Sequence, residues 1–142
     1  MRSALAAIAF VLLAFARPAA AGAALGLGAD WLTDPNKGEL QLTVAADTPL
    51  ARHITLGARF GMMYFGEGEY VGAPIDGRLR VRFGRIYAEG LVGPWIIFGG
   101  NDTVRLHAAF GFGLATRSLT FGFEVGWVDP TPLIGVRVAF PL

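Results

Sequence analysis

The sequence predicts an all-β protein, an eight-stranded antiparallel up-and-down transmembrane β-barrel that follows an N-terminal signal peptide. Large apolar residues alternate with small or polar ones at a period of two through most of the chain after residue 21. The composition is 54% hydrophobic and only 16% charged, against about 25% charged in typical soluble domains. After residue 21, no apolar run approaches the roughly 20 residues that a spanning helix needs. Hydrophobicity divided into short alternating segments is typical of a membrane β-barrel.

Residues 1–21 have the features of a secretory signal peptide. Arg2 provides a short basic region, residues 4–16 are an unbroken apolar run, and the small residues 19–21 match the A-x-A cleavage pattern. A membrane-anchoring helix is the alternative, but the run is shorter than the roughly 20 residues required. We therefore predict cleavage after Ala21 and a single barrel domain over residues 22–142.

The mature chain is expected to be nearly neutral. Of the 12 basic residues, Arg2 and Arg17 lie in the signal segment, which leaves 10 basic against 11 acidic side chains. This balance, together with export, argues against nucleic-acid binding. The chain has no cysteine, so it can form neither a disulfide nor the lipid-modified N-terminus of a lipoprotein.

The strands can be placed in order from the alternation and from the turn residues between them. The first three are predicted over residues 24–32, 39–46 and 53–65, separated by the turn segments 34–38 and 47–49. The next two are predicted over the following segments, on either side of the tight turn Gly84-Arg85: residues 75–83 and 86–98.

Two features around the fourth and fifth strands depart from this regular plan. Residues 66–74 form the longest predicted loop, with Glu67, Glu69 and Tyr70 as candidates for extracellular contact. Within the fifth strand the alternation weakens at Gly93-Pro94. Because proline cannot donate to a ladder, we predict a bulge or an early end of pairing there.

Residues 104–127 show the clearest alternation and give strands six and seven, divided near Arg117-Ser118. The large apolar face contains Val104, Leu106, Ala108, Phe110, Phe112 and Leu114, then Leu119, Phe121, Phe123, Val125 and Trp127. The opposite face contains Arg105, His107, Ala109, Gly111, Gly113 and Ala115, then Thr120, Gly122, Glu124 and Gly126. After a turn at residues 129–132, residues 133–140 form the eighth strand.

The apolar faces of all eight predicted strands lack Asp, Glu, Lys and Arg, so we assign them to the lipid side. The opposite faces carry nearly balanced charges among many glycines, which suits the narrow interior of an eight-stranded barrel, where buried charges must be paired. His53 and Asp76 also have the inward parity. The predicted interior polar network consists of Asp30, Glu39, Arg59, Arg78, Arg80, Arg82, Glu89, Arg105, His107, Glu124 and Arg137.

Aromatic residues fall near the predicted strand ends, as the two membrane interfaces favour. An up-and-down topology brings one group to one rim: Trp31, Tyr64, Phe98 and Trp127. The other group falls at the opposite rim: Phe83, Tyr87 and Phe140.

The chain resembles the small eight-stranded bacterial outer-membrane proteins, such as OmpX and the membrane domain of OmpA. Residues 135–140, Gly-Val-Arg-Val-Ala-Phe, are similar to the assembly signal of that class, although Pro141 and Leu142 follow the aromatic residue that usually ends it. The resemblance implies a monomer in the lipid bilayer of the bacterial outer membrane, inserted by the barrel-assembly machinery through this strand.

Two groups of inward residues could carry chemistry. His107 with Glu124 could act as a general base, but lipid A deacylases of barrel type have a serine two residues after the histidine, where this chain has Ala109. Arg78, Arg80 and Arg82 could form an anion path, or ion pairs with Glu89, Glu124, Asp30 and Glu39. We expect ion pairs, and we expect no catalytic, cofactor-binding or metal-binding residues.

The expected function is therefore that of a non-enzymatic outer-membrane barrel with a structural or envelope-related role. One alternative is a soluble secreted barrel of lipocalin type, in which the apolar face lines a ligand cavity and the polar face meets water. A second is a lipid-modifying outer-membrane barrel enzyme. A third is a narrow, porin-like channel with water along the arginine row.

Overall fold

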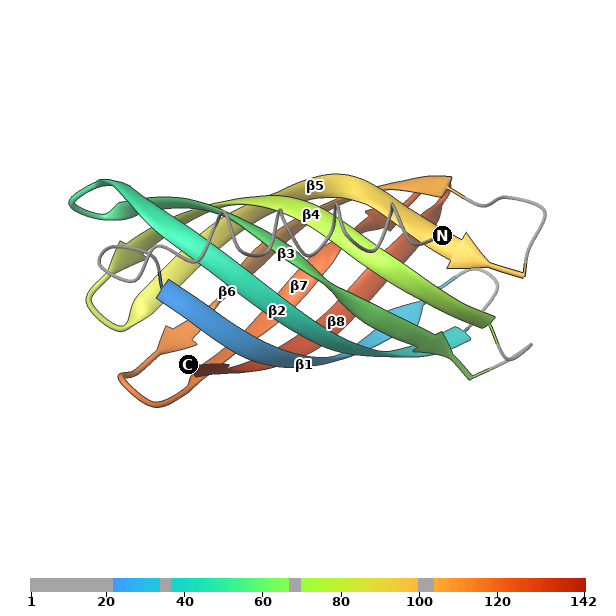
Figure 1. Ribbon diagram of the computed structural model, residues 1–142, viewed down its shortest axis with the longest axis horizontal. Coiled ribbons are helices and arrows are strands. Elements are labelled where there is room, and N and C mark those ends of the chain that lie inside the picture. Colours follow the sequence, from blue (N-terminus) through green and yellow to red (C-terminus); the bar gives the residue numbers. More distant parts are fainter. Residues whose placement is uncertain (1–21, 34–36, 67–69, 100–103) are drawn as a thin grey trace, which may run out of the picture.

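The computed structural model is a closed barrel of eight antiparallel strands in the order β1 to β8 (Figure 1). It describes residues 22–33, 37–66, 70–99 and 104–142, so the predicted signal peptide lies outside the described residues and stays a prediction. The strands are β1 (Gly22–Leu32), β2 (Lys37–Ala51), β3 (Ile54–Phe65), β4 (Tyr70–Phe83), β5 (Ile86–Phe98), β6 (Val104–Ala115), β7 (Thr120–Val128) and β8 (Thr131–Pro141).

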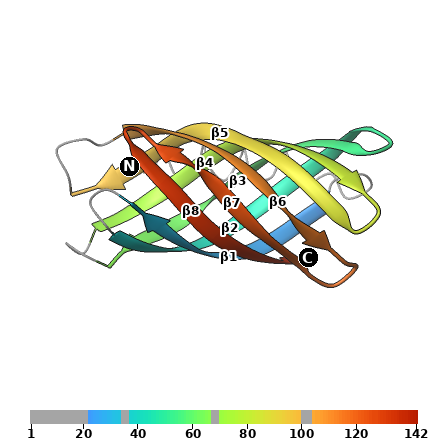
Figure 2. The ribbon, with the colours of Figure 1, turned by 180° about the vertical axis from the view of Figure 1, so that it is seen from behind.

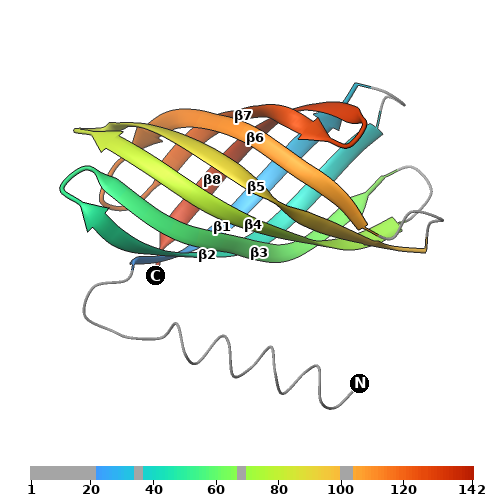
Figure 3. The ribbon, with the colours of Figure 1, turned by 90° about the horizontal axis from the view of Figure 1, so that it is seen from above.

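Each strand pairs with its neighbours in sequence, and β8 closes the barrel by pairing with β1 through partners such as Leu27 and Val138 (Figure 2). The barrel therefore has two distinct ends. The turn end carries the connections at residues 52–53, 84–85 and 116–119, together with the start of β1 and the end of β8. The loop end carries the connections after β1, β3, β5 and β7. Strongly tilted strands join the two ends (Figure 3).

Four strands, β1, β2, β4 and β8, are longer than the sequence predicted. Residues 47–49 do not end β2, because Asp47 still pairs with Gly57 and its side chain points inward to Arg78. The irregularity in this ladder comes only between Pro49 and Ala51. Residues 70–74 belong to β4 rather than to a loop, since they pair with both β3 and β5. Lys37, Gly38, Thr131 and Pro132, predicted as turn residues, are likewise strand residues.

The prediction of a bulge or an early end of pairing at Gly93-Pro94 is wrong as to the bulge and the end of the strand. Pairing with β4 is interrupted at these two residues, between the pairs Gly77–Val92 and Pro74–Trp95, and then resumes. Gly93 pairs with His107 and Pro94 pairs with Leu106, and the register with β4 is the same on both sides of this point. A Cβ atom on Gly93 would lie 1.9 Å from the carbonyl oxygen of Ile75. Glycine therefore permits a close approach of β4 and β5, which explains why the sequence pattern weakens here while the strand continues.

The two faces of the sheet point as predicted, with the apolar face outward and the polar face inward. The outward side chains are large and apolar, including Leu42, Phe110, Phe123 and Ile134, all exposed on the outside of the barrel. Charged side chains such as Arg59, Asp76 and Glu124 are buried inside. This arrangement is the reverse of the lipocalin type, in which the apolar face would line the cavity.

An apolar plug fills the interior at the loop end, where it was not predicted. Its buried members are Leu32, Met63, Phe65, Trp95, Val128 and Leu133, with Tyr70 and Ile97 packed against them. The interior is therefore apolar at the loop end and charged from the middle toward the turn end. In the described part of the chain, no helix is long and apolar enough to cross a membrane.

Candidate functional site

The middle of the barrel holds a layer of polar side chains to which every strand contributes. We call it the central cluster, and its members in strand order are Asp30, Glu39 and Gln41, Arg59, Asp76, Trp95, His107, Glu124 and Arg137. All except Arg137 are less than a tenth exposed, so the layer is held together by its own hydrogen bonds and ion pairs rather than by surrounding water.

Arg59 ties opposite walls of the barrel together. Its Nη2 atom lies 2.7 Å from Oδ2 of Asp76 on the adjacent strand β4, and its Nη1 atom lies 2.7 Å from Oε2 of Glu124 on β7. In an eight-stranded barrel, β3 and β7 are four strands apart in either direction. One guanidinium group therefore spans the lumen, with each carboxylate receiving a charge-assisted hydrogen bond.

Arg137 extends the network toward β1 and β2. Its Nη2 atom donates to Oδ2 of Asp30 at 2.8 Å and to Oε1 of Glu124 at 3.2 Å. The amide of Gln41 then donates to Asp30 at 2.8 Å and to Glu39 at 2.7 Å. A continuous series of contacts thus runs from Glu39 to Asp76 through both arginines.

His107 is a fully enclosed member of this layer. Its Nδ1 atom lies 2.6 Å from Oδ1 of Asp76, and its Nε2 atom lies 3.3 Å from Oε1 of Glu124. Its ring stacks on Trp95 with centroids 4.3 Å apart, and the imidazole is fully buried. The predicted proximity of His107 and Glu124 is confirmed, but the ring is enclosed between carboxylates and an aromatic side chain.

Trp95 is a member that the sequence analysis missed. It is fully buried, and its indole Nε1 donates to Oδ1 of Asp76 at 3.2 Å. The alternation along β5 did indicate that Trp95 faces inward. It has the same parity as three inward residues of this strand, Tyr87, Glu89 and Leu91. The weakened alternation at Gly93-Pro94 hid it.

Inward glycines provide the space that these long side chains occupy. A Cβ atom on Gly135 would lie 1.7 Å from Oδ1 of Asp30, and one on Gly28 would lie 2.7 Å from Nη1 of Arg137. Small residues on one strand and long charged residues on its neighbours therefore interlock, as a narrow barrel interior requires.

A second group, the turn-side cluster, lies nearer the turn end and consists of Asp47, Arg78, Arg80, Tyr87 and Glu89. Arg80 lies 2.8 Å from Glu89 and 4.3 Å from the centroid of the Tyr87 ring. Arg78 pairs with Asp47 and lies 3.8 Å from Glu89. The predicted ion pairs of this arginine row are thus confirmed for Glu89, whereas Asp47, predicted to break β2, is an unforeseen partner. Glu124 and Asp30 pair with Arg59 and Arg137 instead.

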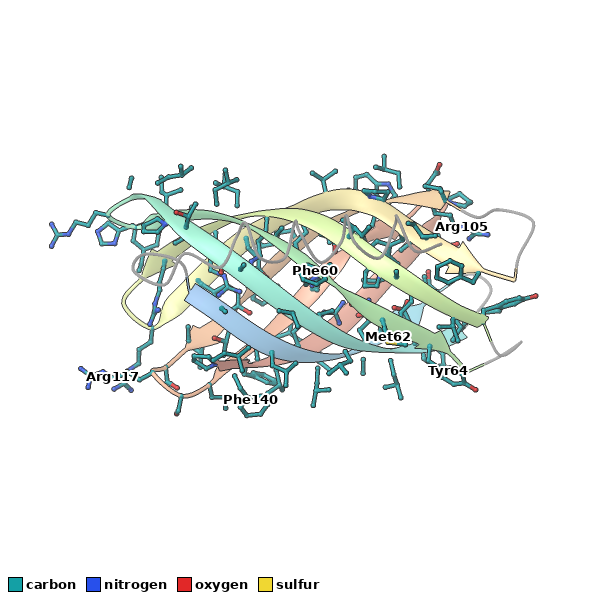
Figure 4. The ribbon with its side chains drawn as sticks, in the orientation of Figure 1. Phe60, Met62, Tyr64, Arg105, Arg117 and Phe140 are labelled. Carbon is teal, nitrogen blue, oxygen red and sulfur yellow. The ribbon has the colours of Figure 1, made fainter. Side chains whose placement is uncertain are left out.

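Three residues predicted to be inward or at an interface lie elsewhere, and a fourth lies at the loop end. Arg82 is not in the interior network; it is exposed at the turn end and donates to the carbonyl oxygens of Gly84 and Ala115. Tyr87, predicted for the aromatic rim, is 2% exposed and inside the barrel. His53 is exposed between β2 and β3, where its ring stacks on Phe83. Arg105 is half-buried at the loop end (Figure 4).

The remaining rim aromatics are placed as expected. The exposed side chains at the loop end are Trp31, Tyr64, Phe98 and Trp127. Phe83 and Phe140 are exposed toward the turn end. Figure 4 shows Tyr64 and Arg105 at the same end of the barrel, the loop end. Two aromatic groups separated by the length of the strands match the two interfaces of a bilayer.

The described interior is occupied largely by its own side chains. Within the described ranges, no group of three or more His, Asp and Glu side chains could hold a metal ion. The charged middle is covered toward the loop end by the apolar plug. The arrangement is suited to holding the barrel in one closed shape.

Comparisons with known proteins support the fold. No protein family matches the chain, and no curated protein matches it. A solved structure from the de novo design of transmembrane β-barrels is similar with a TM-score of 0.65 and 11% identity, covering 85% of this chain and 95% of the other. The solution NMR structure of the de novo designed TMB2.3 is similar with a TM-score of 0.58 and 13% identity, covering 89% and 98%. At these identities the likeness establishes the architecture alone: the chain has the fold of an eight-stranded transmembrane β-barrel.

Proposed function

We propose that the protein is a small integral protein of the bacterial outer membrane with a structural or envelope-related, non-enzymatic role. The observation that carries this proposal is the outer face of the closed barrel, a continuous belt of exposed apolar side chains without charge. In lipid, only a closed sheet satisfies all its backbone groups. Export through residues 1–21, insertion through residues 135–140 and a monomeric state complete the proposal.

The interior supports a structural role over a catalytic one. The two candidate catalytic groups, His107 and Glu124, are 0% and 1% exposed and contact each other, Asp76 and the arginines. A lipid substrate in the surrounding membrane has no route to the imidazole, since the barrel wall and Trp95 enclose it. The same burial supports a sealed lumen over a channel, because Arg78 and Arg80 already pair with acidic side chains.

The proposal is tested by folding the mature chain, residues 22–142, with and without lipid. A membrane barrel folds only in detergent or vesicles, and migrates differently on an SDS gel before and after boiling. We expect this heat-dependent mobility, and we expect the full-length chain expressed in a Gram-negative host to fractionate with the outer membrane. A chain that folds as a soluble monomer in aqueous buffer would refute the proposal.

A conductance measurement separates the sealed barrel from the channel. The folded protein inserted in a planar bilayer should give no steady ion current, because the central cluster and the apolar plug fill the lumen. The matched variant Trp95→Ala removes the largest side chain of the central cluster and so opens this layer. It serves as the control for insertion of the protein in the bilayer. Stable, regular current steps from the unmodified protein would favour the channel instead.

A further inference from the structure

The exposed basic side chains of the barrel gather at its turn end. Arg52 lies between β2 and β3, Arg85 between β4 and β5, and Arg117 between β6 and β7, and all three are exposed. Figure 4 shows Arg117 extending from this end of the barrel. We call these three residues the arginine arc. Arg82, also exposed, lies beside it.

Few acidic groups oppose this positive charge. Asp47 is half-buried and already paired with Arg78. No exposed acidic side chain lies at the turn end among the residues that the structure describes. The arc therefore presents positive charge that the protein itself does not neutralise.

Each turn of the arc also carries an exposed apolar side chain. Leu50 precedes Arg52, Phe83 and Ile86 flank Arg85, and Leu119 follows Arg117 in the three turns. An apolar side chain in the hydrocarbon and an arginine a few ångströms further out is the arrangement that places a guanidinium group at the depth of lipid headgroups.

Hydrogen bonds hold the three turns in one fixed surface. The backbone N–H of Arg82 donates to the carbonyl oxygen of His53 at 2.8 Å, which joins β4 to the first turn. Its guanidinium group donates to Ala115 at 3.3 Å, and the N–H of Ala115 donates to the carbonyl oxygen of Arg85 at 2.7 Å. The arginines are therefore anchored to neighbouring turns along the same rim.

We propose that the arginine arc binds the phosphate groups of anionic phospholipids in the leaflet that surrounds the turn end. Arginine matches phosphate oxygens with paired, charge-assisted hydrogen bonds, and an anionic membrane surface attracts each basic residue near it. The inference rests on the proposed membrane location and adds a lipid preference and a side to it. Headgroup binding at one rim also fixes the depth and tilt of the barrel.

The test measures which lipids remain with the folded protein. The mature chain is reconstituted in phosphatidylcholine vesicles and in mixed phosphatidylcholine–phosphatidylglycerol vesicles, then extracted in mild detergent. Mass spectrometry gives the ratio of the two lipids around the protein relative to the bulk. We expect enrichment of phosphatidylglycerol, on the order of fivefold for each arginine that contacts a phosphate group.

The matched variants locate the effect. The triple variant Arg52→Gln, Arg85→Gln, Arg117→Gln should return the lipid ratio to the bulk value, while Lys37→Gln at the loop end should leave the enrichment unchanged. A bulk ratio around the unmodified folded barrel, or full enrichment around the triple variant, would overturn the inference.

Two further arms separate the remaining outcomes. Excess inorganic phosphate should remove no more lipid than sodium chloride of equal ionic strength; a specific loss in phosphate would show a site for soluble phosphate and overturn the lipid assignment. Heat-dependent gel mobility in phosphatidylcholine vesicles is recorded for every variant. If the unmodified chain fails to fold in either vesicle, the proposed membrane barrel is refuted, whereas a folded barrel with bulk lipid refutes only the arginine arc.

Discussion

The central cluster and the turn-side cluster use the same kinds of side chain but connect different parts of the barrel. The central cluster takes at least one residue from each of the eight strands, and Arg59 crosses the lumen from β3 to Glu124 on β7. The turn-side cluster joins only β2, β4 and β5. The first group can therefore fix the cross-section of the barrel, while the second reinforces one side of its wall.

Some charged side chains of the turn-side cluster are also more exposed than those of the central cluster. The side chains of Arg59 and Asp76 are 4% and 0% exposed, whereas those of Arg80 and Asp47 are 17% and 19% exposed. A charge left without its partner in the first environment has no water to replace it. In the turn-side cluster solvent reaches Arg80 and Asp47, while Arg78 and Glu89 are 7% and 6% exposed and lie 3.8 Å apart, so each still has the other when a further partner is lost. Equal chemical changes should therefore have unequal effects on the two clusters.

The largest effect is expected from Arg59→Met. The change leaves Asp76 without its guanidinium partner and leaves Glu124 with Arg137 alone, at 3.2 Å. Breaking a buried pair from one side costs about 3–5 kcal/mol. Urea unfolding in vesicles, followed by tryptophan fluorescence, measures the loss. Adding Glu124→Gln should recover part of it, since a buried carboxylate that has lost one of its two arginine partners is removed. A loss no greater than that of Arg80→Met would contradict the proposed difference between the clusters.

A smaller but distinct effect is expected from Gly93→Ala, next to the central cluster. The new Cβ atom would lie 1.9 Å from the Ile75 carbonyl oxygen and 2.8 Å from the Asp76 Cα atom, so the backbone must shift. Such overpacking costs about 1–3 kcal/mol. Gly90→Ala is the matched control on the same strand, because no atom lies within 4 Å of its added Cβ. Its free energy of unfolding should stay equal or rise by up to about 1 kcal/mol. Equal losses for both variants would show that β4 and β5 are not closely packed at Gly93.

Arg80→Met tests the turn-side cluster directly. It removes the ion pair with Glu89 and the contact with the Tyr87 ring. Glu89 keeps Arg78 at 3.8 Å, and Arg80 is partly hydrated in the native barrel. We expect a loss of about 1 kcal/mol in the same urea measurement. A loss as large as that of Arg59→Met would show that partial exposure does not weaken the effect of losing a charge partner here.

The barrel fold and its lipid-facing side follow from sequence because both depend on local alternation. Every second residue of a strand has the same face, so a charge-free series such as Phe121, Phe123 and Val125 identifies the outside without any knowledge of partners. The strand limits were harder, since Asp47 and Pro49 have the chemistry of turn residues. What kept Asp47 in β2 is its contact with Arg78, 31 positions away in sequence.

The central cluster was only partly predictable for the same reason. Parity placed Asp30, Arg59, Asp76 and Glu124 inside, but it gives no position along the barrel axis. That position depends on register, which brings Arg59 beside Asp76 and Gly111 beside Glu124. Parity also cannot detect where a strand leaves the interior at its end.

Arg82 lies at such a strand end, and it carries the smallest expected effect. It shares the parity of Arg78 and Arg80, yet it is exposed, and its guanidinium group donates to the carbonyl oxygens of Gly84 and Ala115. The Arg82→Gln variant should change the free energy of unfolding by no more than about 0.5 kcal/mol, as for most exposed positions. Urea unfolding of this variant beside Arg80→Met compares the free energies of unfolding for two changes that lie two residues apart on β4. If Arg82→Gln proved the more damaging, the charged interior would have to extend further toward the turn end than the structure places it.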